Sequence, residues 1–351
     1  MTQSQVDFVI VGASLQARLV AGLLAATHGR AVLFIGPSQA AYRLPRQLDL
    51  SLAPITRPDT WDLLRSALPE VTTLLKKLGA RKAWTRLDPV LFASAPAGRQ
   101  LLGHLRHMAL GFGMAAERVP TAALGRDREG IVLPDAMLLQ RALLEPLLDQ
   151  WLDRLGVRRM EAAPIAVAAN GSAQITLGEE IVSATQTVLA DDDAILAHLP
   201  ADAWPNLFTR EVASSLLTEP TAPLQAPVML DLDTGITLLQ QAGRGLVAMG
   251  RGPLDPFAAA VRVLLGQERK LQQVGQASYT RLVTLDGAPA VGRINGSGPD
   301  VLAGFGAHAA FFAPALARWL CGAATPAESA WMAGRLVDRA LPSAVADWSA
   351  P

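Results

Sequence analysis

Charge is scarce in this sequence, and neither sign prevails. Charged residues make up 18% of its 351 residues, lysine and arginine together equal aspartate and glutamate, and the net charge is +0. Without a basic or acidic tract, a nucleic-acid partner is not expected. Hydrophobic residues amount to 50%, which is ample for a core and leaves material for a buried subunit interface, so we expect a homo- or hetero-oligomer.

Cysteine and long hydrophobic runs are scarce as well. Cys321 is the single cysteine, which excludes an internal disulfide and favours a reducing compartment; its apolar neighbours predict a core residue rather than a reactive thiol. The first residues, MTQSQVD, have no basic segment of a secretory signal, so a cytoplasmic location is expected. No membrane span is expected, because the longest apolar stretch, residues 302–320, contains His308, Pro314, Arg318 and two glycines.

Several catalytic motifs are missing. The sequence has no G-x-S-x-G nucleophile elbow, no phosphate-binding P-loop and no H-E-x-x-H zinc motif. His104 and His107 could share one face of a helix, but no aspartate, glutamate or cysteine completes a ligand set at a suggestive spacing. We therefore expect no metal site and an exposed or capping role for the two histidines.

The chain begins with the pattern of a β-α-β unit. Residues 7–11 form a short apolar run, typical of a strand that is buried on both faces, and Gly12 ends it. Residues 15–27 have helical spacing of leucine and alanine, Gly29 stops the helix, and residues 31–35 form a second buried strand. The crossover is expected to be right-handed. The pattern predicts an α/β fold that starts with a Rossmann-like unit.

Two later segments support this fold class. An amphipathic helix is predicted over residues 135–155, and Gly156 caps it. The last segment predicts a strand, a loop, a second strand and a long helix that ends around Leu320. Strands and helices thus alternate again at the end of the chain.

The dinucleotide-binding fingerprint after the first strand is incomplete. It needs three small residues, which allow a tight turn, close approach to a pyrophosphate, and packing of helix on strand. Gly12 is the first of these, Ala13 follows it, and Ser14 and Ala17 hold the second and third places. Gly36 stands where an aspartate or glutamate would bind the ribose hydroxyls. By itself, this start is also compatible with a fold that binds no dinucleotide.

Three consecutive aspartates at residues 191–193 follow the apolar run T-V-L-A, which ends at Ala190. If they face a pyrophosphate, like-charge repulsion opposes its binding. Alternatively, they begin the next helix as N-terminal acids. Both interpretations remain open at this stage.

The most informative pattern lies near the end of the chain. Residues 279–293 read Y-T-R-L-V-T-L-D-G-A-P-A-V-G-R, and residues 301–316 read V-L-A-G-F-G-A-H-A-A-F-F-A-P-A-L. This resembles the C-terminal signature of the D-amino-acid-oxidase and glycine-oxidase family of FAD enzymes. In that family an arginine-containing T-x-D-G-x-P-x-I-G stretch precedes a glycine- and histidine-rich loop and an A-P helix. Two positions depart from the pattern: Leu282 replaces a common proline, and Phe305 replaces a more polar residue.

The resemblance implies an FAD/NAD(P)-binding Rossmann-like domain interleaved with a smaller, mostly antiparallel α+β substrate domain. The first domain would comprise residues 1–81, 135–210 and 280–351. The second would comprise residues 82–134 and 211–279. Each is thus expected to assemble from segments that lie far apart in the sequence.

The resemblance also implies FAD as cofactor and a set of residues around it. Arg281 would grip a substrate carboxylate, because a guanidinium pairs with a carboxylate through two parallel hydrogen bonds; alternatively, it is a solvated strand residue or pairs with a nearby acid. The loop at residues 304–309 would lie near the flavin, or it is a packing loop with one buried, hydrogen-bonded histidine. The residues expected beside FAD are Gly12, Ala13, Ser14, Ala17, Gly36, Ile165, Ala190, Gly292, Gly304, Phe305, Gly306, Ala307 and His308.

Two functions follow as hypotheses. The first is an FAD-dependent oxidoreductase that oxidises a C–N bond of a small amine or amino acid by hydride transfer to flavin, for which no obvious catalytic base is found or required. The second is a non-catalytic or partner-subunit member of the same fold that has lost normal FAD binding, favoured by Ser14, Gly36 and the aspartates at 191–193. An NAD(P)-dependent enzyme is disfavoured by the missing ribose acid and by the C-terminal signature.

Overall fold

The computed structural model describes residues 3–38, 43–52, 54–125, 127–266 and 268–340. The ends of the predicted domain ranges, residues 1–2 and 341–351, lie outside the described residues. The helices are α1 (Leu15–His28), α2 (Pro58–Lys77), α3 (Pro96–Gly111), α4 (Thr121–Leu124), α5 (Arg141–Arg154), α6 (Asp192–His198), α7 (Leu254–Leu265), α8 (Ala313–Leu320) and α9 (Pro326–Ala333), with 3-10 turns η1 (Ala201–Ala203), η2 (Ile294–Gly296) and η3 (Gly306–Phe312). The strands are β1 (Gln3–Val11), β2 (Val32–Ile35), β3 (Asp49–Leu50), β4 (Trp84–Leu87), β5 (Val90–Ala93), β6 (Glu117–Val119), β7 (Glu129–Val132), β8 (Ala136–Leu139), β9 (Arg158–Met160), β10 (Ile165–Val167), β11 (Ala173–Leu177), β12 (Glu180–Leu189), β13 (Phe208–Thr218), β14 (Val228–Asp231), β15 (Thr237–Gln240), β16 (Leu246–Arg251), β17 (Gln273–Thr284), β18 (Ala290–Arg293) and β19 (Asp300–Ala303).

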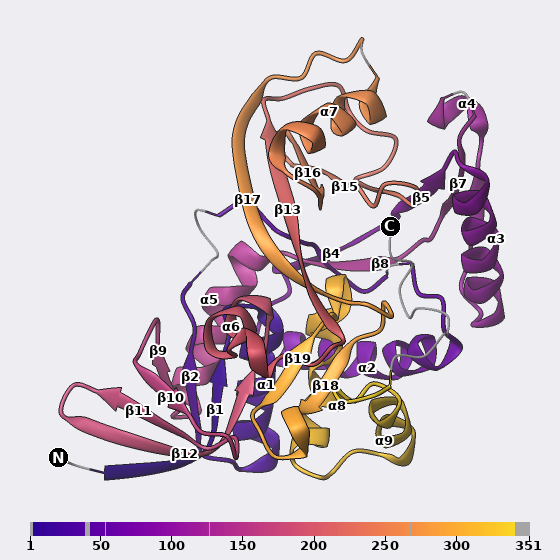
Figure 1. Cartoon of the computed structure of the whole chain (residues 1–351). Coiled ribbons are helices and arrows are strands. Elements are labelled where there is room, and N and C mark those ends of the chain that lie inside the picture. Colours follow the sequence, from indigo (N-terminus) through magenta and orange to yellow (C-terminus); the bar gives the residue numbers. More distant parts are fainter. Residues whose placement is uncertain (1–2, 39–42, 53, 126, 267, 341–351) are drawn as a thin grey trace.

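The first sheet contains the β-α-β unit that the N-terminal sequence predicts (Figure 1). Its strands follow the order β10-β11-β12-β1-β2-β9; β1 is parallel to both β2 and β12, and β19 is parallel to the end of β12. Phe8 and Ile10 of β1 pack in the same cluster as α1, while Val9 and Val11 pack in a separate cluster on the other face. Burial on both faces explains why this strand is a continuous apolar run.

The second sheet is mostly antiparallel. Its order is β17-β13-β16-β15-β14-β5-β7-β6, with β14 and β5 as the parallel pair. Phe257 and Val261 of α7 pack in its core cluster, and β3, β8 and β4 form a short third sheet. The predicted fold class is thereby confirmed: a Rossmann-like α/β sheet is interleaved with a mostly antiparallel one.

The long strands β13 and β17 run from the second sheet to the first (Figure 1). Phe208 and Leu282, at one end of the pair, pack in the core cluster beneath the first sheet, whereas Leu216 packs in the cluster of the second. Residues 279–284 therefore lie between the two sheets. Because the two strands are continuous across residues 211 and 279, a domain division at those residues stays a prediction.

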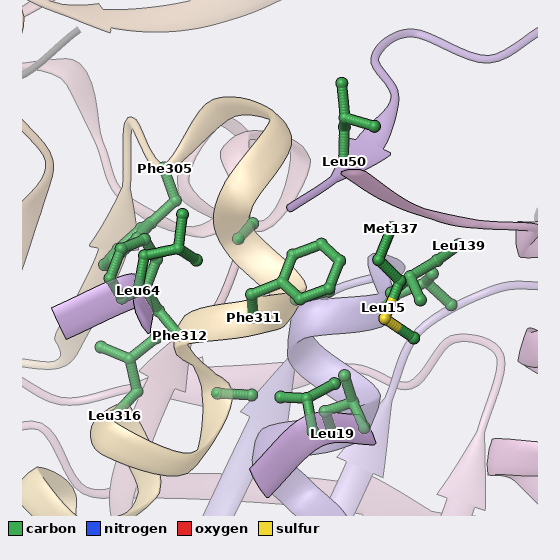
Figure 2. Close-up of a cluster of buried hydrophobic side chains, with 14 of the residues drawn as sticks. Leu15, Leu19, Leu50, Leu64, Met137, Leu139, Phe305, Phe311, Phe312 and Leu316 are labelled. Carbon is green, nitrogen blue, oxygen red and sulfur yellow. The ribbon is translucent and has the colours of Figure 1, made fainter. Parts of the chain in front are cut away.

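A buried cluster joins the C-terminal segment to α1 (Figure 2). Phe311 of η3 lies on the side of Leu15 and Leu19 of α1, whereas Phe312 lies beside Leu64 of α2 and Leu316 of α8, and all of these side chains are buried in one cluster. Phe312 also stacks on Trp331 of α9, with ring centroids 5.4 Å apart. As a result η3 and α8 are anchored in the core, which fixes the position of the loop that precedes them.

The predicted helix over residues 135–155 is wrong at its start. Residues 136–139 form β8, which pairs with β3 and β4, and α5 begins at Arg141. A short apolar run suits a buried strand as well as a helix, and here hydrogen bonds to two neighbouring strands decide the outcome. Asp135 has a φ of 67°, which breaks any continuous helix. The end of the helix is confirmed, because Gly156 adopts a φ of 72°.

Three other sequence predictions concern single side chains or helices. Cys321 is half-buried where α8 ends and packs against the main core cluster, so it lies at the edge of the core rather than inside it. His104 and His107 are exposed on α3, and Nε2 of His104 lies 2.9 Å from the carbonyl oxygen of Thr56. Within the described ranges, no helix combines the length and hydropathy that crossing a membrane requires.

Candidate functional site

The loop between β1 and α1 directs backbone N–H groups outward at the positive end of the helix. Gly12 has a φ of 155°, which residues with a side chain rarely adopt, so the chain can turn there. Ser14 caps α1, because its hydroxyl accepts a hydrogen bond of 3.1 Å from the N–H of Ala17. The N–H groups of Ala13 and Ser14 precede the first helical turn and have no partner inside it. This loop can therefore bind an anion.

The carboxylate of Asp191 occupies this loop. Its Oδ2 accepts hydrogen bonds from the N–H groups of Ala13 at 2.6 Å and Ser14 at 2.9 Å, and its Oδ1 accepts one from Ala194 at 3.0 Å. Burial raises the pKa of Asp191, and the three N–H donors counter that shift. The aspartates do begin a helix, since Asp191 caps α6 and the next two lie in its first turn. Asp191 also faces the fingerprint loop, and its repulsion of a pyrophosphate there stays a prediction.

Gly36 at the end of β2 has no room for a side chain. A Cβ there would lie 2.0 Å from the carbonyl oxygen of Gly12. The contact is fixed by two backbone hydrogen bonds of 2.9 Å, from Gly12 to Ile35 and from Gly36 to Met160. Backbone packing therefore explains why no aspartate or glutamate stands here to bind a ribose. Any side chain at this position would force the backbone to shift.

Arg18 holds the same loop from the core side. It is 1% exposed, and its Nη1 donates a hydrogen bond of 2.6 Å to the carbonyl oxygen of Ala13. Its Nη2 pairs with buried Glu145 at 3.0 Å and its Nε pairs with Asp149 at 2.9 Å. Sequence reasoning missed this residue, although a single charged side chain in the mostly apolar helix segment L-Q-A-R-L-V-A-G-L-L is a visible signal.

A cavity of about 330 Å³ extends from this loop to the C-terminal signature. It joins Ser14 and the three aspartates to the end of β17 and to the loop at residues 304–309. The lining residues are Ser14, Gln16, Arg46, Gln47, Arg141, Asp191, Asp192, Asp193, Tyr279, Thr280, Arg281, Leu282, Val283, Thr284, Gly287, Leu302, Gly304, Phe305, Gly306, Ala307, His308 and Ala309. The two stretches that carry the signature begin at residues 279 and 301, and both line this one cavity.

The structure brings some of the predicted FAD residues together and leaves others apart. Gly12 and Ala13 form the loop with Ser14, and Ala17 lies in the first turn of α1. The N–H of Ala190 bonds to the carbonyl oxygen of Val11 beside that loop. In contrast, Ile165 lies on β10 at the edge of the first sheet, and a Cβ at Gly292 would face Leu336 and Trp319. Six of the predicted residues line the cavity: Ser14, Gly304, Phe305, Gly306, Ala307 and His308. The remaining predicted residues do not line it: Gly12, Ala13, Ala17, Gly36, Ile165, Ala190 and Gly292.

Each guanidinium that lines the cavity has a carboxylate partner. Arg46 pairs with Asp193 at 2.7 Å, and Arg141 pairs with Asp49 at 3.2 Å. For Arg281 the alternative prediction of a nearby acid is confirmed. Oε2 of Glu211, directly opposite on β13, accepts hydrogen bonds from its Nε and Nη2 at 2.8 and 2.6 Å. A role of Arg281 in holding substrate stays a prediction.

Asp192 is a titratable group in the cavity that the sequence analysis considered only as part of the aspartate run. Its Oδ2 accepts a hydrogen bond of 3.0 Å from the N–H of Leu282. Burial raises the pKa of Asp192 to about 7, with further increases from Asp191 and Asp193, against the lowering effects of the Leu282 N–H and Arg281. The carboxyl group therefore changes its protonation near neutral pH, as general acids and bases do.

The contribution of Asp192 to stability is expected to depend on pH. Its pKa in the folded chain is about 7, against an ordinary value of 3.8, so the folded chain holds a proton that the unfolded chain has released. The resulting stabilisation is fully present below the ordinary pKa and is lost as the pH rises through 7. Relative to an Asp192→Asn variant, the unaltered chain should lose about 2 kcal/mol of unfolding free energy between about pH 5.5 and pH 8.5.

Denaturant unfolding of both proteins across this pH range is the measurement. Burial lowers the pKa of His308 to about 3, so its contribution has the opposite sign, but it is common to both proteins and cancels in the difference. Unfolding free energies that vary in parallel with pH would contradict the raised pKa of Asp192.

The loop at residues 304–309 combines backbone exposure with a fixed position. Gly304 and Gly306 have φ values of 71° and 52°, which favour glycine, and both line the cavity. Phe305 is 2% exposed and packs on the rings of Phe312 and Trp331. His308 is 1% exposed and neutral, because burial lowers its pKa to about 3. The loop is thus a core-anchored wall of the cavity.

Among the described residues, no group of three histidine, cysteine, aspartate or glutamate side chains is arranged to hold a metal ion.

No protein-family model matches the chain, and no curated protein matches its sequence.

Solved structures match the chain over nearly its whole length. The L-amino acid deaminase from Proteus myxofaciens is 12% identical at a TM-score of 0.74, and the alignment covers 94% of this chain and 93% of that one. The L-proline dehydrogenase from P. horikoshii is 13% identical at a TM-score of 0.73, with 95% and 97% covered. The glycine oxidase from Geobacillus kaustophilus is 15% identical at a TM-score of 0.68, with 91% and 94% covered. At these identities the likeness shows the fold, which is the fold that the C-terminal signature implies.

Proposed function

We propose that the protein is an FAD-dependent oxidoreductase that oxidises a C–N bond of a small amine or amino acid. The observation that carries this proposal is the single cavity shared by the fingerprint loop, by Arg281 on β17, and by the loop at residues 304–309. These are the segments that the family signature sets along a flavin. The fold shared with amino-acid oxidoreductases supports the same function by analogy.

The chemistry of the site fits FAD at both ends. The N–H groups of Ala13 and Ser14 hold Oδ2 of Asp191, which stands in for a phosphate oxygen, so this donor set takes an anion. At the other end, Gly304 and Gly306 present backbone without side chains to the cavity. The fit at the first end requires the Asp191 carboxylate to leave the loop.

The chain's own residues have separate roles in this proposal. FAD, when bound, would supply the acceptor for a hydride from the carbon next to nitrogen. Nη1 of Arg281, the nitrogen that does not contact Glu211, would hold a substrate carboxylate. Oδ1 of Asp192 would take a proton from the substrate ammonium group, which leaves the nitrogen lone pair to form the C=N bond. Buried Phe305 and neutral His308 would limit water at the cavity wall.

Replacing Arg281 with alanine is expected to raise KM for a carboxylate-bearing substrate by about 30-fold, or about 2 kcal/mol, with a smaller change in kcat. The estimate is modest because the Arg281 side chain is 34% exposed and already neutralised by Glu211. Steady-state kinetics would measure both constants. Arg210→Ala is the matched control, since this neighbouring guanidinium stacks on Trp204 at 4.4 Å and does not line the cavity. An equal KM in Arg281→Ala and in the unaltered chain would remove the assigned role.

A second function is favoured by a specific observation. Asp191 fills the anion site and Gly36 accepts no side chain, which supports a member of the fold that has lost normal FAD binding and acts as a partner subunit. A visible absorbance spectrum, taken before and after incubation with FAD, separates the two. A flavin band that survives desalting supports the oxidoreductase. No retained flavin in either sample, or co-purification of a second chain without flavin, supports the partner subunit.

A further inference from the structure

The contact between Asp191 and the loop follows from the pairing of two strands far apart in the sequence. β1 and β12 are parallel, and Val11 lies opposite Leu189. The segments that follow β1 and β12 therefore leave the sheet side by side, which places residue 191 next to residues 12–14. Gly12 permits the close approach, since a Cβ there would lie 2.8 Å from Oδ2 of Asp191.

The three aspartates have distinct partners, which makes the position of Asp191 specific. Asp192 accepts from the N–H of Leu282, and Asp193 pairs with Arg46. Asp191 alone of the run contacts the loop, where it accepts from Ala13 and Ser14 while it also caps α6. Its backbone is extended, with a φ of −162° and a ψ of 174°, as expected of an N-cap residue. The carboxylate is thus held by two helix N-termini at once.

We propose that Asp191 is an intramolecular competitor for the dinucleotide phosphate, so that the chain takes up FAD only when this carboxylate leaves the loop. The inference rests on the proposed function for the identity of the ligand. A phosphate group and a carboxylate cannot share the same two N–H donors, and their like charges repel at contact distance. Displacing Asp191 also exchanges two hydrogen bonds from the protein for two to the ligand, so the net gain on binding FAD is small.

Asp191→Ser is the variant that tests this competition. Serine is a good N-cap, so it can still accept from the N–H of Ala194, but it is too short to reach the loop. Asp193→Ser is the matched control, because it removes one negative charge at the start of the same helix without touching the loop. Asp191→Asn keeps the shape and the acceptor oxygen while it removes the charge. It is the second variant should Asp191→Ser fail to fold.

The measurements are the dissociation constant of FAD, from quenching of flavin fluorescence, and the shift of the unfolding midpoint by ADP. ADP carries adenosine and the two phosphates without the flavin ring, so it reports on the nucleotide half of the site, to which the loop belongs. We expect Asp191→Ser to bind FAD about tenfold tighter than the unaltered chain, which is about 1.4 kcal/mol, and to gain a larger midpoint shift from ADP. Asp191→Asn should gain less, and Asp193→Ser should change little.

The outcomes separate this inference from the proposed function. Equal affinities of Asp191→Ser and the unaltered chain for FAD and ADP would overturn the inference, as would a folded Asp191→Ser variant that binds neither ligand. If the unaltered chain binds FAD tightly and Asp191→Ser binds it no more tightly, the competition by Asp191 is overturned, while FAD as the cofactor is supported. A gain in ADP binding without substrate-dependent flavin reduction would support the competition and count against the oxidoreductase.

Discussion

Replacing Arg18 with leucine is expected to lower the free energy of unfolding by about 3–5 kcal/mol. The guanidinium is 1% exposed and its partner Glu145 is fully buried, so the variant removes one member of an ion pair in the core. Asp149 loses a partner as well. The variant also removes the donor to the carbonyl oxygen of Ala13, which should loosen the loop between β1 and α1. Denaturant unfolding measures the loss.

The double variant Arg18→Leu, Glu145→Leu is the control for this interpretation. Removing both members of a buried ion pair is often close to neutral, whereas removing one leaves an uncompensated charge. Most of the lost stability should therefore return in the double variant. A single variant that costs under about 1 kcal/mol would mean that other contacts hold both Glu145 and the loop between β1 and α1.

The first part of the fold could be predicted because its pattern is local. The apolar run at residues 7–11 is buried on both faces, and Gly29 takes a left-handed φ of 60° where the helix ends, as its place in the sequence indicates. The helix predicted from residue 135 failed because the apolar run at residues 136–139 has no periodicity of its own. Its pairing with β3 and β4 depends on chain segments more than 40 residues away.

The candidate site was predictable to the extent that its residues belong to one signature. Arg281 and the loop at residues 304–309 are close in sequence and meet on one cavity. The destination of Asp191 was not predictable, because the strand register that sets it joins residues 178 apart. The sequence left two interpretations of the aspartate run open, and the structure assigns a different partner to each of the three carboxylates.

Replacing Gly36 with alanine is expected to cost more than about 3 kcal/mol of unfolding free energy. The new Cβ would lie 2.0 Å from the carbonyl oxygen of Gly12, so backbone rather than a flexible side chain has to move. Gly12 and Gly36 are each held by a backbone hydrogen bond, to Ile35 and Met160, and the shift strains both. Gly29→Ala is the matched control, because its Cβ would meet nothing within 4 Å, and it should cost only about 1 kcal/mol for its positive φ.

The same contact decides whether the missing ribose acid can be restored. Suppose that Gly36→Ala lowers the unfolding free energy as much as expected. Gly36→Glu should then unfold at a lower denaturant concentration than the unaltered chain and bind FAD no more tightly, because the loop cannot keep its conformation around a side chain. A Gly36→Ala variant within about 1 kcal/mol of the unaltered chain would show that the two loops separate easily. In that case Gly36→Glu should tighten FAD binding, since a carboxylate at this position could then reach the ribose hydroxyls. Any weakness of FAD binding would then rest on side chains that substitution can reverse, and Asp191 would be the remaining obstacle in the loop.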